Sequence, residues 1–137
     1  MPEYLDAPQD VLDLAAKLAL THPEADFAKA RIKYMTKPMK RSKWAGRCYL
    51  AHGPWAHLLA DYDYIVVIWA EWWEALGNEA RREPLLYHEL CHIIRTESGR
   101  WALRQHPITE FPEVIAEYGC WSPELECLVP HVKRAYR

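Results

Sequence analysis

The pattern of hydrophobic and polar positions in the first half of the chain predicts two helices followed by two strands. Apolar residues recur every three or four positions over residues 9–20 and again over 24–35, which is typical of amphipathic helices. Residues 61–69 are almost continuously β-branched or aromatic, as in a strand that is covered on both faces. Residues 43–51 place bulky apolar side chains around Gly46 and predict another strand. We therefore expect a short sheet of two or three strands.

Glycine, proline and capping residues divide the second half of the chain into helices. Asn78 can cap a helix whose main body covers residues 83–96, and Ser98–Gly99 closes that helix. The other helices are expected over residues 70–76, over 109–118 and from Ser122 onward. Helices at both ends with short strands between them indicate the α+β class. With 137 residues, the chain suits a single domain covering residues 1–137.

The composition is that of an ordinary globular protein. Hydrophobic residues make up 50% of the chain and charged residues 26%, and the formal net charge of −2 argues against a protein that binds nucleic acid over its whole surface. No apolar run approaches the roughly 18 residues of a membrane span, and the first residues do not resemble a secretion signal. The four cysteines form no CxxC pair, so we expect reduced thiols and a cytoplasmic location.

One segment departs from this balance of charges. Eight basic residues and no acidic residue lie between Lys29 and Arg47. The eight are Lys29, Arg31, Lys33, Lys37, Lys40, Arg41, Lys43 and Arg47. Such a segment forms either a solvated basic face or a contact with nucleic acid or an acidic partner.

Residues 88–92 carry the chemistry, because they read His-Glu-Leu-Cys-His and form an HExxH motif inside a predicted helix. Two histidines four positions apart project from one helical face, close enough to hold one Zn²⁺ ion. Glu89 lies beside them, where its carboxylate can take a proton from an attacking water molecule. The motif therefore predicts a zinc site with ligands His88 and His92 and a general base, Glu89.

A catalytic zinc site needs a third protein ligand and one open position. The extended form with a glycine and a third histidine on the same stretch does not apply, because Arg95 and Ser98 occupy those two positions. The residues alone leave His106, Glu113 and Glu117 as candidates for the third ligand.

A family resemblance distinguishes these candidates. HELCH, followed after a loop by QHPITEFPEVIAEYG, resembles the minimal zincins of the SprT/Spartan type and, more closely, the phage metallopeptidases. In that pattern a histidine a few residues before a phenylalanine is the third ligand. The resemblance implies a small zincin-like fold in which His106 joins His88 and His92 around Zn²⁺. It also implies that Glu89 is the general base and that Phe111 is a packing residue.

The resemblance covers roughly residues 25–121. In small zincins a strand with a Trp-Gly-x-Cys core precedes the active-site helix, and residues 43–48 are similar to it apart from an inserted alanine. The chain departs from the family pattern at Pro107, where an acidic residue is common. This departure concerns the residues that orient His106 rather than the ligand itself.

Two functions from different classes follow. The first is a zinc-dependent peptidase, phage- or prophage-encoded, that acts on a protein or peptide substrate. The second is a non-catalytic, zinc-stabilised module that contacts nucleic acid or a protein partner through residues 29–47. Glu89 favours the peptidase, because a structural zinc site has no use for a carboxylate beside its first ligand and would close the fourth position with Cys or His. Cys91 is a poor fourth ligand, since its position in the motif directs it away from the metal face.

Overall fold

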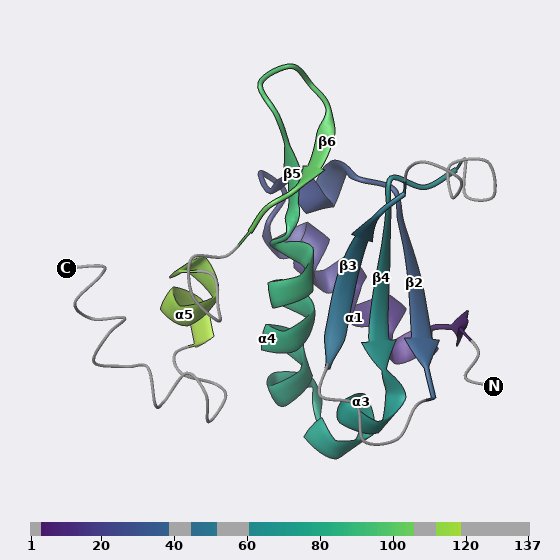
Figure 1. The fold of residues 1–137 in the computed structure, drawn as a ribbon. Coiled ribbons are helices and arrows are strands. Elements are labelled where there is room, and N and C mark those ends of the chain that lie inside the picture. Colours follow the sequence, from purple (N-terminus) through teal and green to yellow (C-terminus); the bar gives the residue numbers. More distant parts are fainter. Residues whose placement is uncertain (1–3, 39–44, 52–60, 106–111, 119–137) are drawn as a thin grey trace. The chain divides into compact units, whose positions relative to one another are not determined.

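A mixed four-stranded sheet is the main structure of the N-terminal part of the chain (Figure 1). The computed structural model describes residues 4–38, 45–51, 61–105 and 112–118. The chain divides into two compact units, residues 1–104 and 105–137, and each is described by itself. The strands of the sheet are β1 (Leu5–Asp6), β2 (Ile32–Lys37), β3 (Gly46–Leu50) and β4 (Tyr64–Trp69), in the order β1-β2-β4-β3.

Strand β4 lies inside the sheet and is the most buried strand. It pairs in parallel with β2, from Ile32 opposite Tyr64 onward, and antiparallel with β3, where Gly46 lies opposite Ile68. Tyr64 and Val66 are completely buried. These pairings confirm the predicted strand at 61–69 and explain its nearly continuous run of β-branched and aromatic residues, because both of its faces are covered.

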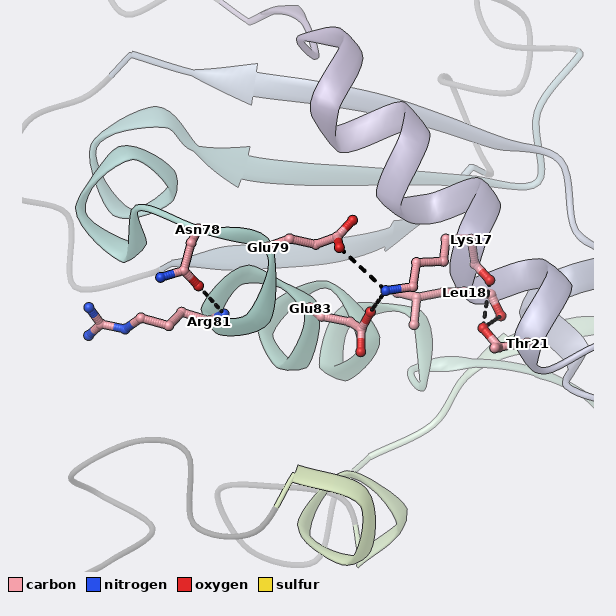
Figure 2. Close-up of polar contacts among 7 residues, drawn as sticks. All are labelled: Lys17, Leu18, Thr21, Asn78, Glu79, Arg81 and Glu83. Atoms are coloured by element: carbon pink, nitrogen blue, oxygen red, sulfur yellow. Dashed lines mark hydrogen bonds and ion pairs between the residues drawn. The ribbon is translucent and has the colours of Figure 1, made fainter.

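Two helices of this unit pack against each other. Helix α1 (Gln9–Thr21) buries the face formed by Val11, Leu14, Ala15 and Leu18, as its apolar spacing predicts. Helix α4 (Glu79–Leu90) lies beside it. Lys17 of α1 forms ion pairs with Glu79 at 3.4 Å and with Glu83 at 2.9 Å, as Figure 2 shows.

Helix α4 begins at a well-formed cap. Helix α3 (Ala70–Leu76) follows β4 directly and ends at Gly77, whose φ of 81° suits glycine. Asn78 then adopts an extended backbone, and its Oδ1 accepts a hydrogen bond from the backbone N–H of Arg81 at 3.0 Å (Figure 2). The predicted cap is therefore confirmed, and α4 begins directly after it, earlier than residue 83.

Helix α4 also ends earlier than expected. The predicted helix at 83–96 is wrong beyond Leu90, because residues Ile93–Arg95 form strand β5, which pairs antiparallel with β6 (Trp101–Leu103). The consecutive β-branched residues Ile93 and Ile94 favour this pairing over further helical turns. Ser98–Gly99 belongs to the turn of this hairpin, with φ of 83° at Gly99, rather than to a helix end.

The second predicted helix, at 24–35, is also wrong. A single 3-10 turn, η1 (Asp26–Lys29), occupies its first half, and β2 begins at Ile32. Some of the apolar residues at helical spacing lie in η1 and the others in β2. Residues of β2 form a strand because their pairing with β4 stabilises the chain more than a helix would. This extra strand and the short β1 enlarge the expected sheet of two or three strands to four, while the predicted α+β class is confirmed.

The C-terminal unit contains helix α5 (Pro112–Tyr118), which lies within the predicted helix at 109–118. The helix expected from Ser122 lies outside the described residues, and the single domain over 1–137 stays a prediction. None of the helices in the described ranges combines the length and apolar character that a bilayer-spanning helix needs.

We expect Asn78→Ala to destabilise the helix that carries the HExxH motif. Loss of the side-chain acceptor leaves the backbone N–H of Arg81 without its cap, so the free energy of unfolding should fall by about 1 kcal/mol. Urea unfolding of the two proteins measures this change. Asn78→Asp keeps an acceptor oxygen at the same place and should remain close to the wild type; equal losses in both variants would contradict the capping role.

Candidate metal centre

The HExxH motif spans the end of α4. His88 and Glu89 lie in the helix, whereas His92 follows its last residue, Leu90. The backbone nevertheless continues for one tightened turn, because the N–H of Cys91 donates to the carbonyl of Tyr87 at 2.9 Å and the N–H of His92 donates to that of Glu89 at 3.3 Å. The two imidazole rings therefore stay on one side, with centroids 5.2 Å apart and planes inclined at 80°.

His92 is held from outside the helix by Arg104, the residue that follows β6. The carbonyl of His92 accepts a hydrogen bond from the backbone N–H of Arg104 at 2.7 Å. In turn, Nδ1 of His92 lies 2.7 Å from the carbonyl oxygen of Arg104. Because a carbonyl only accepts, Nδ1 must carry the proton, and Nε2 is then the nitrogen whose lone pair can bind a metal.

Glu89 completes the cluster. Its residue is only 4% exposed, and its Oε1 lies 4.0 Å from Nε2 of His92. One ligand atom each from His88, Glu89 and His92 lies within 4.8 Å of the others. Two imidazole nitrogens and a carboxylate are donors that suit Zn²⁺. Ligand atoms of one zinc ion lie within about 4 Å of each other, so a separation of up to 4.8 Å is close to what one ion requires.

The β5–β6 hairpin, which leads to Arg104, is tied to the central sheet by Tyr64. The hydroxyl of Tyr64 donates to the carbonyl of Ala102 at 2.6 Å and also lies 3.2 Å from that of Ile94. Its ring meets Trp101 edge-on, with centroids 5.7 Å apart. Burial raises the pKa of Tyr64 to about 12. The first residue of β4 thus connects the hairpin, and through it His92, to the core.

Tyr64 and Arg104 are the supporting residues that the sequence did not reveal. Tyr64 looks like any aromatic residue of a buried strand. Arg104 acts through its backbone N–H and carbonyl, which every residue except proline possesses, so its type carries no signal. Only the pairing of β5 with β6 brings it beside His92.

The structure brings together three of the four predicted site residues, and the fourth, His106, lies outside the described residues, as do Phe111 and Pro107. Of the alternative ligands, Glu117 lies exposed on α5, and the side chain of Glu113 is not among those described. Cys91 is buried but does not belong to the metal-ligating cluster found in the described residues.

The basic segment 29–47 contains all of β2 and the first two residues of β3. Two of its cations form ion pairs within the protein, Lys33 with Asp6 at 2.8 Å and Arg31 with Asp63 at 3.1 Å. Lys37 lies over aromatic rings, 4.8 Å from that of Tyr4. Lys40, Arg41 and Lys43 lie outside the described residues. The expected contact with nucleic acid gains no support from these placements.

A His/Glu/His cluster that could hold a metal ion thus lies at the end of a helix, beside a small mixed sheet. A family model described as "Putative phage metallopeptidase" matches residues 2–134, and the chain belongs to this family. Searches among curated proteins and among solved structures gave no significant match. The resemblance to the phage metallopeptidases inferred from the sequence is thus confirmed, and the family is one of metal-dependent peptidases, whose substrates are peptides.

We expect Tyr64→Phe to lower the free energy of unfolding by about 1–2 kcal/mol near neutral pH, because the partly buried carbonyls of Ala102 and Ile94 lose the hydroxyl that contacts them. The difference from wild type should shrink at high pH. The folded-state pKa of about 12 lies above the unfolded value of about 10. The hydroxyl's contribution is therefore complete below about pH 10 and is lost as the pH rises toward 12.

Urea unfolding at a series of pH values measures this difference. Tyr4→Phe is a suitable control, because Tyr4 is 49% exposed and its substitution should change stability little at any pH. A difference between wild type and Tyr64→Phe that stays constant up to pH 12 would show that the hydroxyl does not act as a buried donor.

Proposed function

We propose that this protein is a zinc-dependent peptidase that hydrolyses peptide bonds with Glu89 as general base and His88, His92 and His106 as metal ligands. One observation carries the proposal: His88, Glu89 and His92 converge within 4.8 Å at the end of α4. Membership of a metallopeptidase family supports the same reaction. The substrate is a protein or peptide, as the family implies.

The donor set supports zinc as the metal. Neutral imidazole nitrogens are ligands that Zn²⁺ favours, and catalytic zinc sites combine three protein ligands with one open position. When bound, zinc lowers the pKa of water to about 7 and polarises the peptide carbonyl. The hydrogen bond from Nδ1 of His92 to Arg104 fixes the ring and increases the basicity of Nε2.

Glu89 transfers the proton in the proposed reaction. At 4.0 Å from Nε2 of His92, Oε1 is beyond hydrogen-bond distance, and it lies beside the metal position rather than bound to the imidazole. In the proposed mechanism, Oε1 takes a proton from the attacking water and delivers it to the nitrogen of the departing amine. The same carboxylate thus acts first as base and then as acid.

The sequence resemblance supports His106 as the third ligand. In the pattern of the phage metallopeptidases, a histidine a few residues before a phenylalanine fills this place, and His106 precedes Phe111 in this chain. Glu113 and Glu117 are the alternative ligands that the experiment below distinguishes from it.

We also propose that the protein is encoded by a phage or prophage and is cytoplasmic. The family description matches a phage- or prophage-encoded enzyme. Cys48 is a free thiol, as expected in the reducing cytoplasm.

We expect Glu89→Gln to retain zinc and to lose peptidase activity. Loss of a general base lowers turnover by about 10²–10⁴-fold, while the imidazole ligands remain in place. Metal content by mass spectrometry and cleavage of a broad peptide mixture measure the two properties. A zinc-loaded wild type that cleaves nothing would favour instead the non-catalytic module acting through residues 29–47.

Substitution of the candidate ligands identifies the third one. His106→Ala should lose bound zinc, because two imidazoles alone hold the ion weakly, whereas Glu113→Ala and Glu117→Ala should keep one zinc per chain. Metal analysis of the three purified variants, with His88→Ala as a positive control for loss, tests this expectation. Unchanged zinc content in His106→Ala would show that the ligand set is wrong.

A further inference from the structure

Gly46, the first residue of β3, lies against the side chain of Glu89. A Cβ atom placed on Gly46 would be 3.0 Å from Cγ of Glu89, 3.2 Å from its Oε2 and 3.1 Å from Cδ1 of Ile68. Contacts this short are tighter than ordinary van der Waals distances. The side chain of Glu89 therefore occupies space that any residue other than glycine would fill.

Backbone conformation does not explain this glycine. The positive φ angles found among the described glycines belong to Gly77 and Gly99, so Gly46 adopts a conformation open to other residues. It sits in a regular antiparallel ladder with β4, opposite Ile68, where glycine weakens a strand. The close approach of Glu89 is thus the physical reason for glycine at this position.

The neighbours of Gly46 restrict the orientation of the Glu89 side chain. Ile68 is 1% exposed and belongs to the interior strand β4, so it cannot move aside without disturbing the core. Cys48 lies two residues along β3, on the same face of the sheet as Gly46. Burial, followed by the negative charge of Glu89, raises the pKa of the Cys48 thiol. The carboxylate therefore lies over this face of β3.

We propose that Gly46 is a positioning residue for the general base: by leaving room on β3, it lets the Glu89 side chain fold against the sheet and keeps its carboxylate beside His92. The inference rests on the proposed function, because it gives Glu89 the role of base. It goes further by assigning the orientation of that base to a residue 43 positions away in the chain, on a strand without metal ligands among its described residues.

The test is Gly46→Ala in the zinc-loaded protein. The added methyl group displaces Glu89 by a few tenths of an ångström, so kcat should fall by about tenfold, since a misplacement of 1 Å can lower a rate by about 100-fold. KM and zinc content should remain close to wild type. A crystal structure of the variant should show the Glu89 carboxylate moved from its place beside His92.

Two further variants separate positioning from stability. Gly77→Ala strains a residue with φ of 81° but meets no atom closer than 4.0 Å, so it should lower stability and leave kcat unchanged. Gly46→Ala combined with Ile68→Val removes the 3.1 Å contact with Cδ1 and should recover stability without recovering kcat. This double variant also serves if Gly46→Ala alone does not fold.

The outcomes are distinct. A wild type that binds zinc but cleaves no peptide overturns the proposed function, and the position of Glu89 in the variant crystal structure still tests the role of Gly46. Full kcat in Gly46→Ala, an unmoved carboxylate, or recovery of kcat together with stability in the double variant each overturns the positioning role. Equal residual activity of Glu89→Gln with and without Gly46→Ala supports it, because the two residues then act through one group.

Discussion

The pairing between His92 and Arg104 is the constraint on which the candidate metal centre depends. His92 follows the last residue of α4, so the helix alone does not fix its ring. Two hydrogen bonds of 2.7 Å to the backbone of Arg104 fix both its carbonyl and its Nδ1. Because Arg104 follows strand β6, the β5–β6 hairpin determines which imidazole nitrogen faces the metal position. A ligand at a helix end thus acquires the rigidity of a strand pairing.

Both ends of strand β4 support the His88, Glu89 and His92 cluster from the core. Tyr64, at its beginning, holds the hairpin through the carbonyls of Ala102 and Ile94. Ile68, near its end, packs beside Gly46, which lies against Glu89. The same interior strand therefore supports one of the candidate histidine ligands and the carboxylate of Glu89. Since β4 is paired on both sides and almost fully buried, neither support can shift without rearranging the sheet.

Local patterns predicted the elements whose structure is determined locally. The buried face of α1 and the cap at Asn78 depend on neighbouring residues, and both are confirmed. The strand at 61–69 is confirmed as well, because its nearly continuous β-branched and aromatic residues favour a strand whichever partners it pairs with. The predictions at 24–35 and beyond Leu90 failed because strand pairing decided the structure there: β2 pairs with β4, and Ile93 pairs with Leu103. Periodicity within a short segment contains no information about such partners.

The same distinction applies to the site. His88, Glu89 and His92 could be predicted because one helical turn brings them together, whereas Gly46 approaches Glu89 only after β3 has joined the sheet. A general base has to lie beside the metal without becoming one of its ligands. Gly46 has no Cβ atom, so the Glu89 side chain can lie directly against β3. Because Glu89 is buried, few other orientations are open to this side chain. The sheet therefore sets the orientation of the proposed base, Glu89, and the helix supplies only its place in the chain.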